Sequence, residues 1–283
     1  MTKTLLSIGH GYSAQAFARI LLPLGWRIIG TTRDATGVQA LRDSGIEPLV
    51  WPSADLSSAI SQADCILSSV APNGDGDPVL NAYGAELRAA APTLSWVGYL
   101  STTGVYGDHK GGWVSEETPL SPSTTRGVYR RDAEAAWAQL GLPLHIFRLA
   151  GIYGPGRGPF AKVRAGTARR IIKKNQLFSR IHVEDIAQVL AASIANPNAG
   201  AVYNVCDDNP APPQDVLGYA AQLLGVDMPV AEDFETAEMT PMARSFYAES
   251  KSVSNDRIKS ELGVTLLYPD YKTGLKALLN AGE

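Results

Sequence analysis

The feature that most constrains the fold is the alternation of short apolar runs with amphipathic stretches of helical period. The runs of strand length are residues 4–8, 27–31, 47–50, 65–70, 96–100 and 144–149. The stretches of helical period between them are residues 12–22, 37–44, 56–62, 78–90 and 127–140. Because strands that alternate with helices form parallel sheets covered on both faces, the sequence predicts an α/β protein with a doubly wound parallel sheet.

The pattern changes after residue 149. A loop rich in Gly and Pro and a basic segment come first, at residues 151–159 and 164–174. The elements predicted beyond them are helices at 183–195, 213–224, 254–262 and 271–279, a strand at 201–205, and a loop or lid at 230–251. We therefore expect two units: a sheet domain at residues 1–150, and a smaller region at residues 151–283 that closes over the carboxyl ends of the strands.

Composition excludes several classes of protein. The 283 residues include 25 Lys and Arg against 28 Asp and Glu, so bulk attraction to nucleic acid or anionic membrane is absent. Cys65 and Cys206 are far apart, and the four histidines are dispersed, so no disulfide framework and no metal site is predicted. No apolar stretch reaches the roughly 18 residues of a membrane span. We expect a cytoplasmic protein with no nucleic-acid or membrane partner.

The first predicted strand runs directly into residues 9–14, Gly-His-Gly-Tyr-Ser-Ala, and a helix follows. This is the Gly-x-Gly-x-x-Gly/Ala fingerprint of dinucleotide binding in the strand-to-helix setting that it requires. Gly9 permits the tight turn, Gly11 lets a pyrophosphate approach the backbone, and Ala14 keeps a small side chain where the helix meets the sheet. The cofactor-binding residues predicted in this loop are Gly9, His10, Gly11, Tyr12 and Ser13.

The end of the second predicted strand bears on the choice between NADP and NAD. Arg33 stands about twenty residues after the loop, where an NAD site presents an acid to the ribose hydroxyls. A guanidinium suits a 2′-phosphate through charge-assisted, bidentate hydrogen bonds, so the sequence favours NADP. Asp34 beside it leaves NAD as the alternative, and a solvated surface role for Arg33 is the other interpretation.

Two further positions are candidates for contact with the cofactor. Asp55 follows the third predicted strand, where it would either contact the adenine or cap the next helix. Ala71 follows the fourth predicted strand.

Five segments in a fixed order carry a resemblance to a known family. They are GHGYSA from residue 9, STTGVYG from 101, RLAGIYGPGR from 148, RIHVEDIA from 180 and YNVCDD from 203. With them the chain resembles, over nearly its whole length, the extended and atypical short-chain dehydrogenase/reductase families, the NAD(P)-dependent epimerase/dehydratase group. The resemblance implies a Rossmann-type sheet that binds the dinucleotide and a smaller C-terminal substrate-binding region.

The resemblance also implies a catalytic set of Ser/Thr, Tyr and Lys, in which Tyr exchanges the proton and Lys lowers the Tyr pKa and holds the nicotinamide ribose. Thr102 takes the Ser/Thr role. Thr103 falls where some dehydratases carry an acid, and it is a candidate substrate contact. Because Thr is a poor proton donor, elimination assisted from Thr103 is not supported.

The Tyr-x-x-x-Lys pair is incomplete in either alignment. Tyr129 is the tyrosine of this stretch, but Ala133 stands where the lysine belongs. Aligning on Ala133-Glu134 instead puts Arg126 in the tyrosine position and Arg130 in the lysine position. Arg130 could still hold a ribose hydroxyl and supply positive charge. Tyr129 and Arg130 point about 100° apart on a helix, so a packing role for Tyr129 is an equal alternative.

The second region supplies two more candidates. In the related families the turn at 151–156 packs against the cofactor, which makes Tyr153 either a cofactor contact or a packing residue. Arg180 precedes a helix that should point into the cleft, where it could pair with an anionic substrate. Most of the other basic residues between 157 and 174 are expected to form a solvated face. The resemblance also makes a homodimer an expectation.

The leading hypothesis is thus an NADP-dependent oxidoreductase or epimerase with a degenerate catalytic set, acting on a hydroxyl or carbonyl of an unidentified substrate, such as a sugar nucleotide or another anion. The alternative is a non-catalytic NADP-binding sensor or regulatory subunit.

Overall fold

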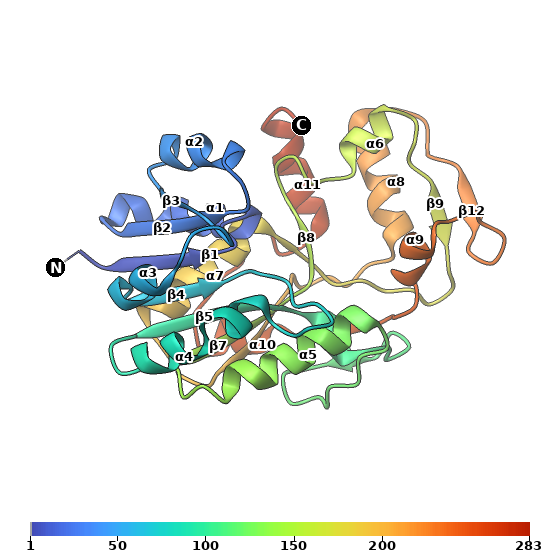
Figure 1. Cartoon of the computed structure of the whole chain (residues 1–283). Helices are drawn as coiled ribbons and strands as arrows, with labels where there is room; N and C mark the ends of the chain where they lie inside the picture. The colour runs from blue at the N-terminus through green and yellow to red at the C-terminus, as the bar shows by residue number, and fades with distance from the viewer. Residues whose placement is uncertain (1) are drawn as a thin grey trace.

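The central element of the fold is a seven-stranded sheet in which every neighbouring pair of strands is parallel (Figure 1). The computed structural model describes residues 2–283, apart from the side chain of residue 242. The strands, in the order β11-β7-β5-β4-β1-β2-β3, are Val202–Val205, Leu144–Leu149, Trp96–Thr102, Cys65–Ser68, Thr4–Ile8, Arg27–Thr32 and Glu47–Val50. The order reverses between β1 and β4, as in doubly wound nucleotide-binding folds. The predicted Rossmann-type sheet is confirmed.

Each face of the sheet buries its own apolar cluster. On one face α1 (Tyr12–Leu21) packs against α7 (Val183–Ala195), and Phe17 and Trp96 are fully buried between helix and sheet. On the other face α3 (Ser57–Gln62), α4 (Pro78–Ala90) and α5 (Thr125–Ala138) cover the strands. The remaining helix of this half, α2 (Thr36–Asp43), follows β2. Two covered faces are what the near-continuous apolar runs of the strands require.

Two helices show how local sequence fixes their starts. At the N-terminus of α4, the Asp77 carboxylate accepts hydrogen bonds from the backbone N–H groups of Val79 and Leu80, and Pro78 takes the first helical position. At α5, the Thr124 hydroxyl accepts from Gly127 N–H. The other Asp77 oxygen accepts from the Trp137 indole at 3.0 Å, which ties α4 to α5.

The strand at 201–205, which the sequence assigned to the second region, lies instead at the edge of the main sheet. It pairs with β7 in parallel, with Asn204 opposite Arg148. The helix α7 likewise belongs to the sheet domain through its contact with α1. The late part of the chain therefore completes the sheet as well as building the second region.

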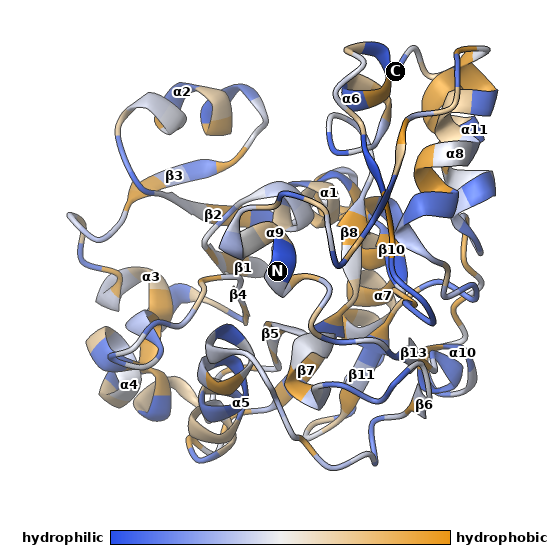
Figure 2. Cartoon of the chain, turned by 90° about the vertical axis from the view of Figure 1, so that its right-hand side faces the viewer, coloured by the Kyte–Doolittle hydropathy of each residue, from blue (hydrophilic) through white to orange (hydrophobic). Residues whose placement is uncertain are grey.

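The second region forms a lobe beside this sheet. Figure 2 shows α6, α8 and α11 gathered above β8 and β10. Its elements are β8 (Gly151–Tyr153), α6 (Phe160–Arg164), β9 (Arg170–Ile172), β10 (Arg180–His182), α8 (Pro213–Leu224), β12 (Ala231–Asp233), α9 (Pro241–Ser245) and α11 (Tyr271–Asn280). The strands β8 and β10 pair, as do β9 and β12. A third apolar cluster, formed mainly by α6, α8 and α11, holds the lobe together.

Short elements complete the chain: the 3-10 helices η1 (Leu22–Leu24) and η2 (Thr103–Tyr106), the paired strands β6 (Trp113–Val114) and β13 (Ser252–Val253), and α10 (Asp256–Ser260). None of the helices in residues 2–283 has both the length and the apolar character needed to cross a bilayer.

Candidate functional site

The loop after β1 has the backbone geometry of a phosphate-binding turn. Gly9 adopts φ +76°, and a Cβ at this position would lie 3.1 Å from Val70 Cγ2, so the turn needs glycine. Its backbone N–H donates to the Thr31 hydroxyl at 2.7 Å, which fixes the loop to the end of β2. The loop is thus anchored to β2 and lies close to the segment that follows β4.

The N-terminus of α1 is open for a ligand. Gly11 is its N-cap residue, and no side chain caps the helix. A Cβ on Gly11 would meet only the Gly9 carbonyl oxygen, at 3.8 Å, so the space above this residue is free. The N–H groups of the first helical turn have no intrahelical acceptor and carry the positive end of the helix dipole. This cradle fits a pyrophosphate.

The side chains of the loop go to different places. His10 is buried, and its Nδ1 lies 2.9 Å from the Ser7 hydroxyl, so any contact of this residue with a ligand has to come through its backbone. Burial lowers the pKa of His10 to about 4. Ser13 is also buried. The Tyr12 hydroxyl donates to the Pro155 carbonyl at 2.9 Å, and the Arg157 guanidinium lies over the Tyr12 ring. The loop at 154–157 therefore touches the start of α1.

Arg33 and Asp34 follow β2, and their side chains differ in whether they have hydrogen-bond partners. Arg33 is exposed and has no hydrogen-bond or ion-pair partner among residues 2–283. The Asp34 carboxylate accepts from the Thr36 hydroxyl and backbone N–H, and these hydrogen bonds lower the pKa of Asp34. The carboxylate is engaged in the turn before α2, whereas the guanidinium is available for a ligand.

Asp55 makes the contacts of a helix-starting residue. Its carboxylate accepts from the backbone N–H and the hydroxyl of Ser57 at 3.1 and 2.8 Å. The Asp55 carboxylate is thus engaged with the first residue of α3, whose N-cap residue is Leu56. Ala71 is exposed in the loop that follows β4.

Thr102 lies at the end of β5 and Tyr129 on α5, as predicted, and the two side chains form no hydrogen bond with each other. Thr102 ends β5, and its hydroxyl accepts from Gly104 N–H at 3.1 Å, with Thr103 next in the chain. Tyr129 lies on α5, with its hydroxyl 3.2 Å from the place of a Cβ on Gly74, in the loop after β4. Both are partly exposed at the carboxyl edge of the sheet.

Arg130 points to a different place from Tyr129, as the helix geometry predicts. Its Nη1 donates to the Leu100 carbonyl at 2.8 Å and to the Tyr99 hydroxyl at 3.0 Å. The guanidinium thus lies against the carboxyl half of β5. A positive charge stands at this edge in place of the lysine that the family pattern leads one to expect.

A buried ion pair behind this edge was not singled out from the sequence. Arg148 of β7 and Glu134 of α5 pair at 2.8 Å, with both side chains almost fully buried. The Ser101 hydroxyl donates to the same carboxylate, and the Arg148 guanidinium also donates to the Tyr106 hydroxyl at 2.9 Å. These bonds fix α5, which carries Tyr129 and Arg130, to the sheet. The Ala-Glu pair in the motif was the only signal of Glu134.

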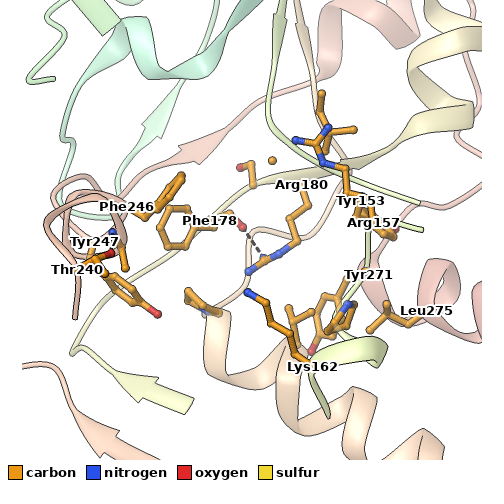
Figure 3. Close-up of a pocket in the computed structure, with 18 residues that line it drawn as sticks. Tyr153, Arg157, Lys162, Phe178, Arg180, Thr240, Phe246, Tyr247, Tyr271 and Leu275 are labelled. Carbon is orange, nitrogen blue, oxygen red and sulfur yellow. Dashed lines mark hydrogen bonds between the residues drawn. The ribbon is translucent and has the colours of Figure 1, made fainter. Parts of the chain in front are cut away.

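A cavity of about 590 Å³ lies in the second region (Figure 3). Its walls come from the loop at 151–159, β10, α6, α8, α9 and α11. Of the predicted site residues it contains Tyr153 and Arg180, whereas Thr102, Tyr129 and Arg130 are not among its lining residues. Arg157 lines it as well, so the cavity adjoins the start of α1 through the contact with Tyr12.

Arg180 is held in place from one side. Its Nη1 donates to the carbonyl oxygens of Phe178 and Ala211, both at 2.9 Å. Asp207 lies nearby without forming an ion pair with it, and burial raises the pKa of Asp207 to about 8. Burial raises the pKa of Tyr153 as well, and its hydroxyl donates to the Asp270 carbonyl at 3.4 Å.

Several residues of the cavity were missed by sequence reasoning. Lys162 belongs to the basic stretch that was expected to be a solvated face, and Phe246 and Tyr247 lie in the stretch expected to be a loop or lid. The aromatic residues beside α9 were the available signal, but nothing in the sequence brings them near β10.

The strand order, the cradle at α1 and the lobe beside the sheet together define a class of nucleotide-binding α/β proteins. The chain belongs to the extended short-chain dehydrogenase/reductase family, in its group of NAD-dependent epimerases and dehydratases. Within it, the chain is similar to protein YeeZ of Escherichia coli K12, with 31% identity over 286 residues that cover 95% of this chain and 97% of that protein.

Two solved structures extend this comparison. A conserved protein of unknown function from Silicibacter pomeroyi is 60% identical, with a TM-score of 0.96 and 99% of each chain covered. A UDP-glucuronic acid 4-epimerase from Bacillus cereus, solved in complex with NAD, is 16% identical, with a TM-score of 0.78, 98% of this chain and 97% of that chain covered. The second likeness shows the fold alone. No family model matches the chain.

Proposed function

We propose that the protein is an NADP-dependent oxidoreductase or epimerase that acts on a hydroxyl or carbonyl group of a small-molecule substrate in the cytoplasm. The observation that carries the proposal is the uncapped N-terminus of α1 behind Gly11, combined with the unpaired Arg33 at the end of the neighbouring strand. The NAD-bound state of the Bacillus cereus epimerase, which has the same fold, supports a nicotinamide dinucleotide as the cofactor.

The residues present fit this cofactor. The backbone of Gly9, Gly11 and Tyr12 would hold the pyrophosphate, because its N–H groups and the space above Gly11 suit an anion. Arg33 would pair with a 2′-phosphate, since its guanidinium is free while Asp34 is engaged with Thr36. When bound, the nicotinamide donates or accepts a hydride.

The residues at the carboxyl edge of the sheet would handle the substrate oxygen. The Thr102 hydroxyl would hold it by a hydrogen bond, and the Tyr129 hydroxyl would exchange its proton. Arg130 would supply the positive charge at this edge, because an arginine stays protonated at every relevant pH. Thr103 and Arg180 would contact the substrate, the latter through an anionic group.

Calorimetric titration with NADPH and NADH tests the cofactor assignment. We expect the Arg33→Ala variant to bind NADPH at least tenfold more weakly than the unmodified protein, because the charge-assisted hydrogen bonds to the 2′-phosphate are lost. Binding of NADH should change by less than twofold. Arg42→Ala is the matched control, since Arg42 is an exposed arginine on α2 with no role in the proposed site.

Equal losses in the Arg33 and Arg42 variants would contradict the NADP assignment. Failure of the unmodified protein to bind either nucleotide would contradict the proposed function itself.

A non-catalytic NADP-binding sensor is the second candidate, and the missing lysine favours it. Arg130 stands at the edge of the sheet with its guanidinium bonded to Leu100 and Tyr99, and it cannot act as a proton-exchanging ammonium. A sensor would bind a protein partner in proportion to the NADPH/NADP ratio and would not exchange a hydride. Stereospecific exchange of deuterium into the nicotinamide during turnover would exclude it.

A further inference from the structure

Two positive side chains converge in the cavity of the second region. Lys162 of α6 and Arg180 of β10 point toward one another across it (Figure 3). The Lys162 ammonium has no hydrogen-bond or ion-pair partner among the described residues, and the Arg180 guanidinium donates through Nη1 to the backbone carbonyl oxygens of Phe178 and Ala211. Like charges that face each other repel, so an anion bound between the two side chains would stabilise this arrangement.

No acid among the described lining residues supplies that anion. None of the described residues that line the cavity is Asp or Glu. Asp207 acts on Arg180 from outside the lining without forming an ion pair with it, and burial raises the pKa of this carboxyl to about 8, which favours its neutral form. Asp215 is a weaker influence on Arg180. The cavity therefore keeps an uncompensated positive charge that an anionic ligand would neutralise.

The rest of the wall suits a flat apolar group. Phe178 and Tyr247 meet edge to face with their ring centres 6.2 Å apart, while Phe246 and Tyr271 add two more rings. The apolar side chains Ile152, Val216 and Leu275 complete the lining. Rings of this kind stack on, or meet edge-on, the faces of another aromatic ring.

The same wall is poorly equipped for a sugar nucleotide. Each hydroxyl of a hexose, and the edge of a nucleobase, needs a hydrogen-bond partner when it is buried. Among the described lining residues there is no Asn, Gln, Asp or Glu side chain, and hydroxyl groups are limited to Ser, Thr and Tyr. Of the three cations in the lining, Arg157 lies over the Tyr12 ring, and Lys162 and Arg180 meet at one point between aromatic rings. This arrangement selects for an anionic group on an apolar body.

We propose that the substrate class of this enzyme is a ring-bearing acid, in which one carboxylate or phosphate sits between Lys162 and Arg180 and an aromatic ring lies against Phe178 and Tyr247. This inference rests on the proposed function, because it takes the cavity as the substrate-binding part of the NADP-dependent enzyme. The inference narrows the substrate class from an unspecified anion to a compact acid with an apolar ring.

Titration of the full-length protein, saturated with NADPH, tests the inference with defined probes. The probes are cinnamate, cinnamyl alcohol, phenyl phosphate and UDP-glucose. We expect cinnamate or phenyl phosphate to bind at least tenfold more tightly than cinnamyl alcohol and than UDP-glucose. Preference for cinnamate assigns a carboxylate substrate, and preference for phenyl phosphate assigns a phosphate; either result supports the inference.

The Lys162→Met variant tests whether the acid binds in the cavity beside Lys162. Lys162 is exposed on a short helix, so the variant should fold, and we expect it to bind the preferred acid about tenfold more weakly. The matched control is Lys174→Met, an exposed lysine that does not line the cavity. It should bind the acid like the unmodified protein.

Equal binding of the acid and the alcohol, tighter binding of UDP-glucose, or equal losses in the two lysine variants would each overturn the inference. If NADPH binds in these experiments, the proposed function survives that result. Binding of the acid to a protein that binds no NADPH would overturn the proposed function, and with it the role of the acid as a substrate.

Discussion

His10 illustrates how a single residue of a motif is divided between structure and function. Its backbone forms part of the glycine loop, while its imidazole lies inside the protein, close enough to Gly30 that a Cβ there would be 3.0 Å from His10 Cγ. Burial keeps the ring neutral by lowering its pKa to about 4. The stability of the folded protein should therefore depend on pH through this residue.

The consequence for stability can be measured. The pKa of about 4 in the folded protein lies below the usual histidine value of 6.5, so between these values the unfolded chain binds more protons than the folded protein. His10 should therefore contribute no destabilisation above pH 6.5 and should cost up to about 3 kcal/mol as the pH falls to 4. We expect His10→Asn to lose less stability than the unmodified protein between pH 7 and pH 5, measured by urea unfolding. Parallel pH profiles would contradict this.

At the same scale, the site was partly predictable. Gly9, Gly11 and Arg33 could be placed from spacing alone, because a strand, a turn and a helix fix where their backbones lie. The ion pair of Glu134 and Arg148 could not be predicted from the sequence, because only the packing of α5 on β7 brings the two side chains together.

At the scale of elements, a single residue, Asp77, caps the N-terminus of α4 and also binds a side chain of α5. Asp77 caps α4 with one oxygen and accepts from the Trp137 indole with the other. Replacing it by Ala removes the cap and leaves a buried indole N–H without an acceptor. We expect Asp77→Ala to lower the free energy of unfolding by about 2–4 kcal/mol. Urea unfolding followed by circular dichroism measures this loss.

Two further variants serve as comparisons for the unfolding free energy of Asp77→Ala. Asp75→Ala changes an exposed neighbour and should cost less than about 0.5 kcal/mol. The loss of unfolding free energy in Asp77→Asn should lie between the losses in Asp75→Ala and Asp77→Ala. The amide oxygen of Asn can still cap α4, whereas its N–H₂ group cannot accept a hydrogen bond from Trp137. A loss in Asp77→Ala no larger than that in Asp75→Ala would show that the cap and the indole contact contribute little.

Most elements could be predicted from the sequence because each carries its own period and boundary residues. The bounds of β1, β3, β7, α4, α7 and α8 match the predictions residue for residue. The place of β11 could not be predicted, since a strand's pattern does not say which edge it joins. The cavity was missed for the same reason: its walls are set by how α6, α9 and β10 approach one another.

The whole molecule is more interdependent than a division at residue 150 suggests. A fragment of residues 1–150 would lack β11 and α7, and would expose the edge of β7 and the apolar face of α1. We expect this fragment to show no cooperative thermal unfolding by calorimetry, unlike the full chain. A fragment of residues 1–210 restores both neighbours and should regain a transition. A cooperative transition in the shorter fragment would refute this dependence.

The position of β11 also sets an order of events during synthesis. When β7 leaves the ribosome, its partner on one side is already present, but the strand for its other side is still to be translated. At about 5–20 residues per second, the edge waits for several seconds as an open template for wrong pairing. Slower translation between residues 150 and 205 lengthens the interval in which this edge of β7 is open to wrong pairing.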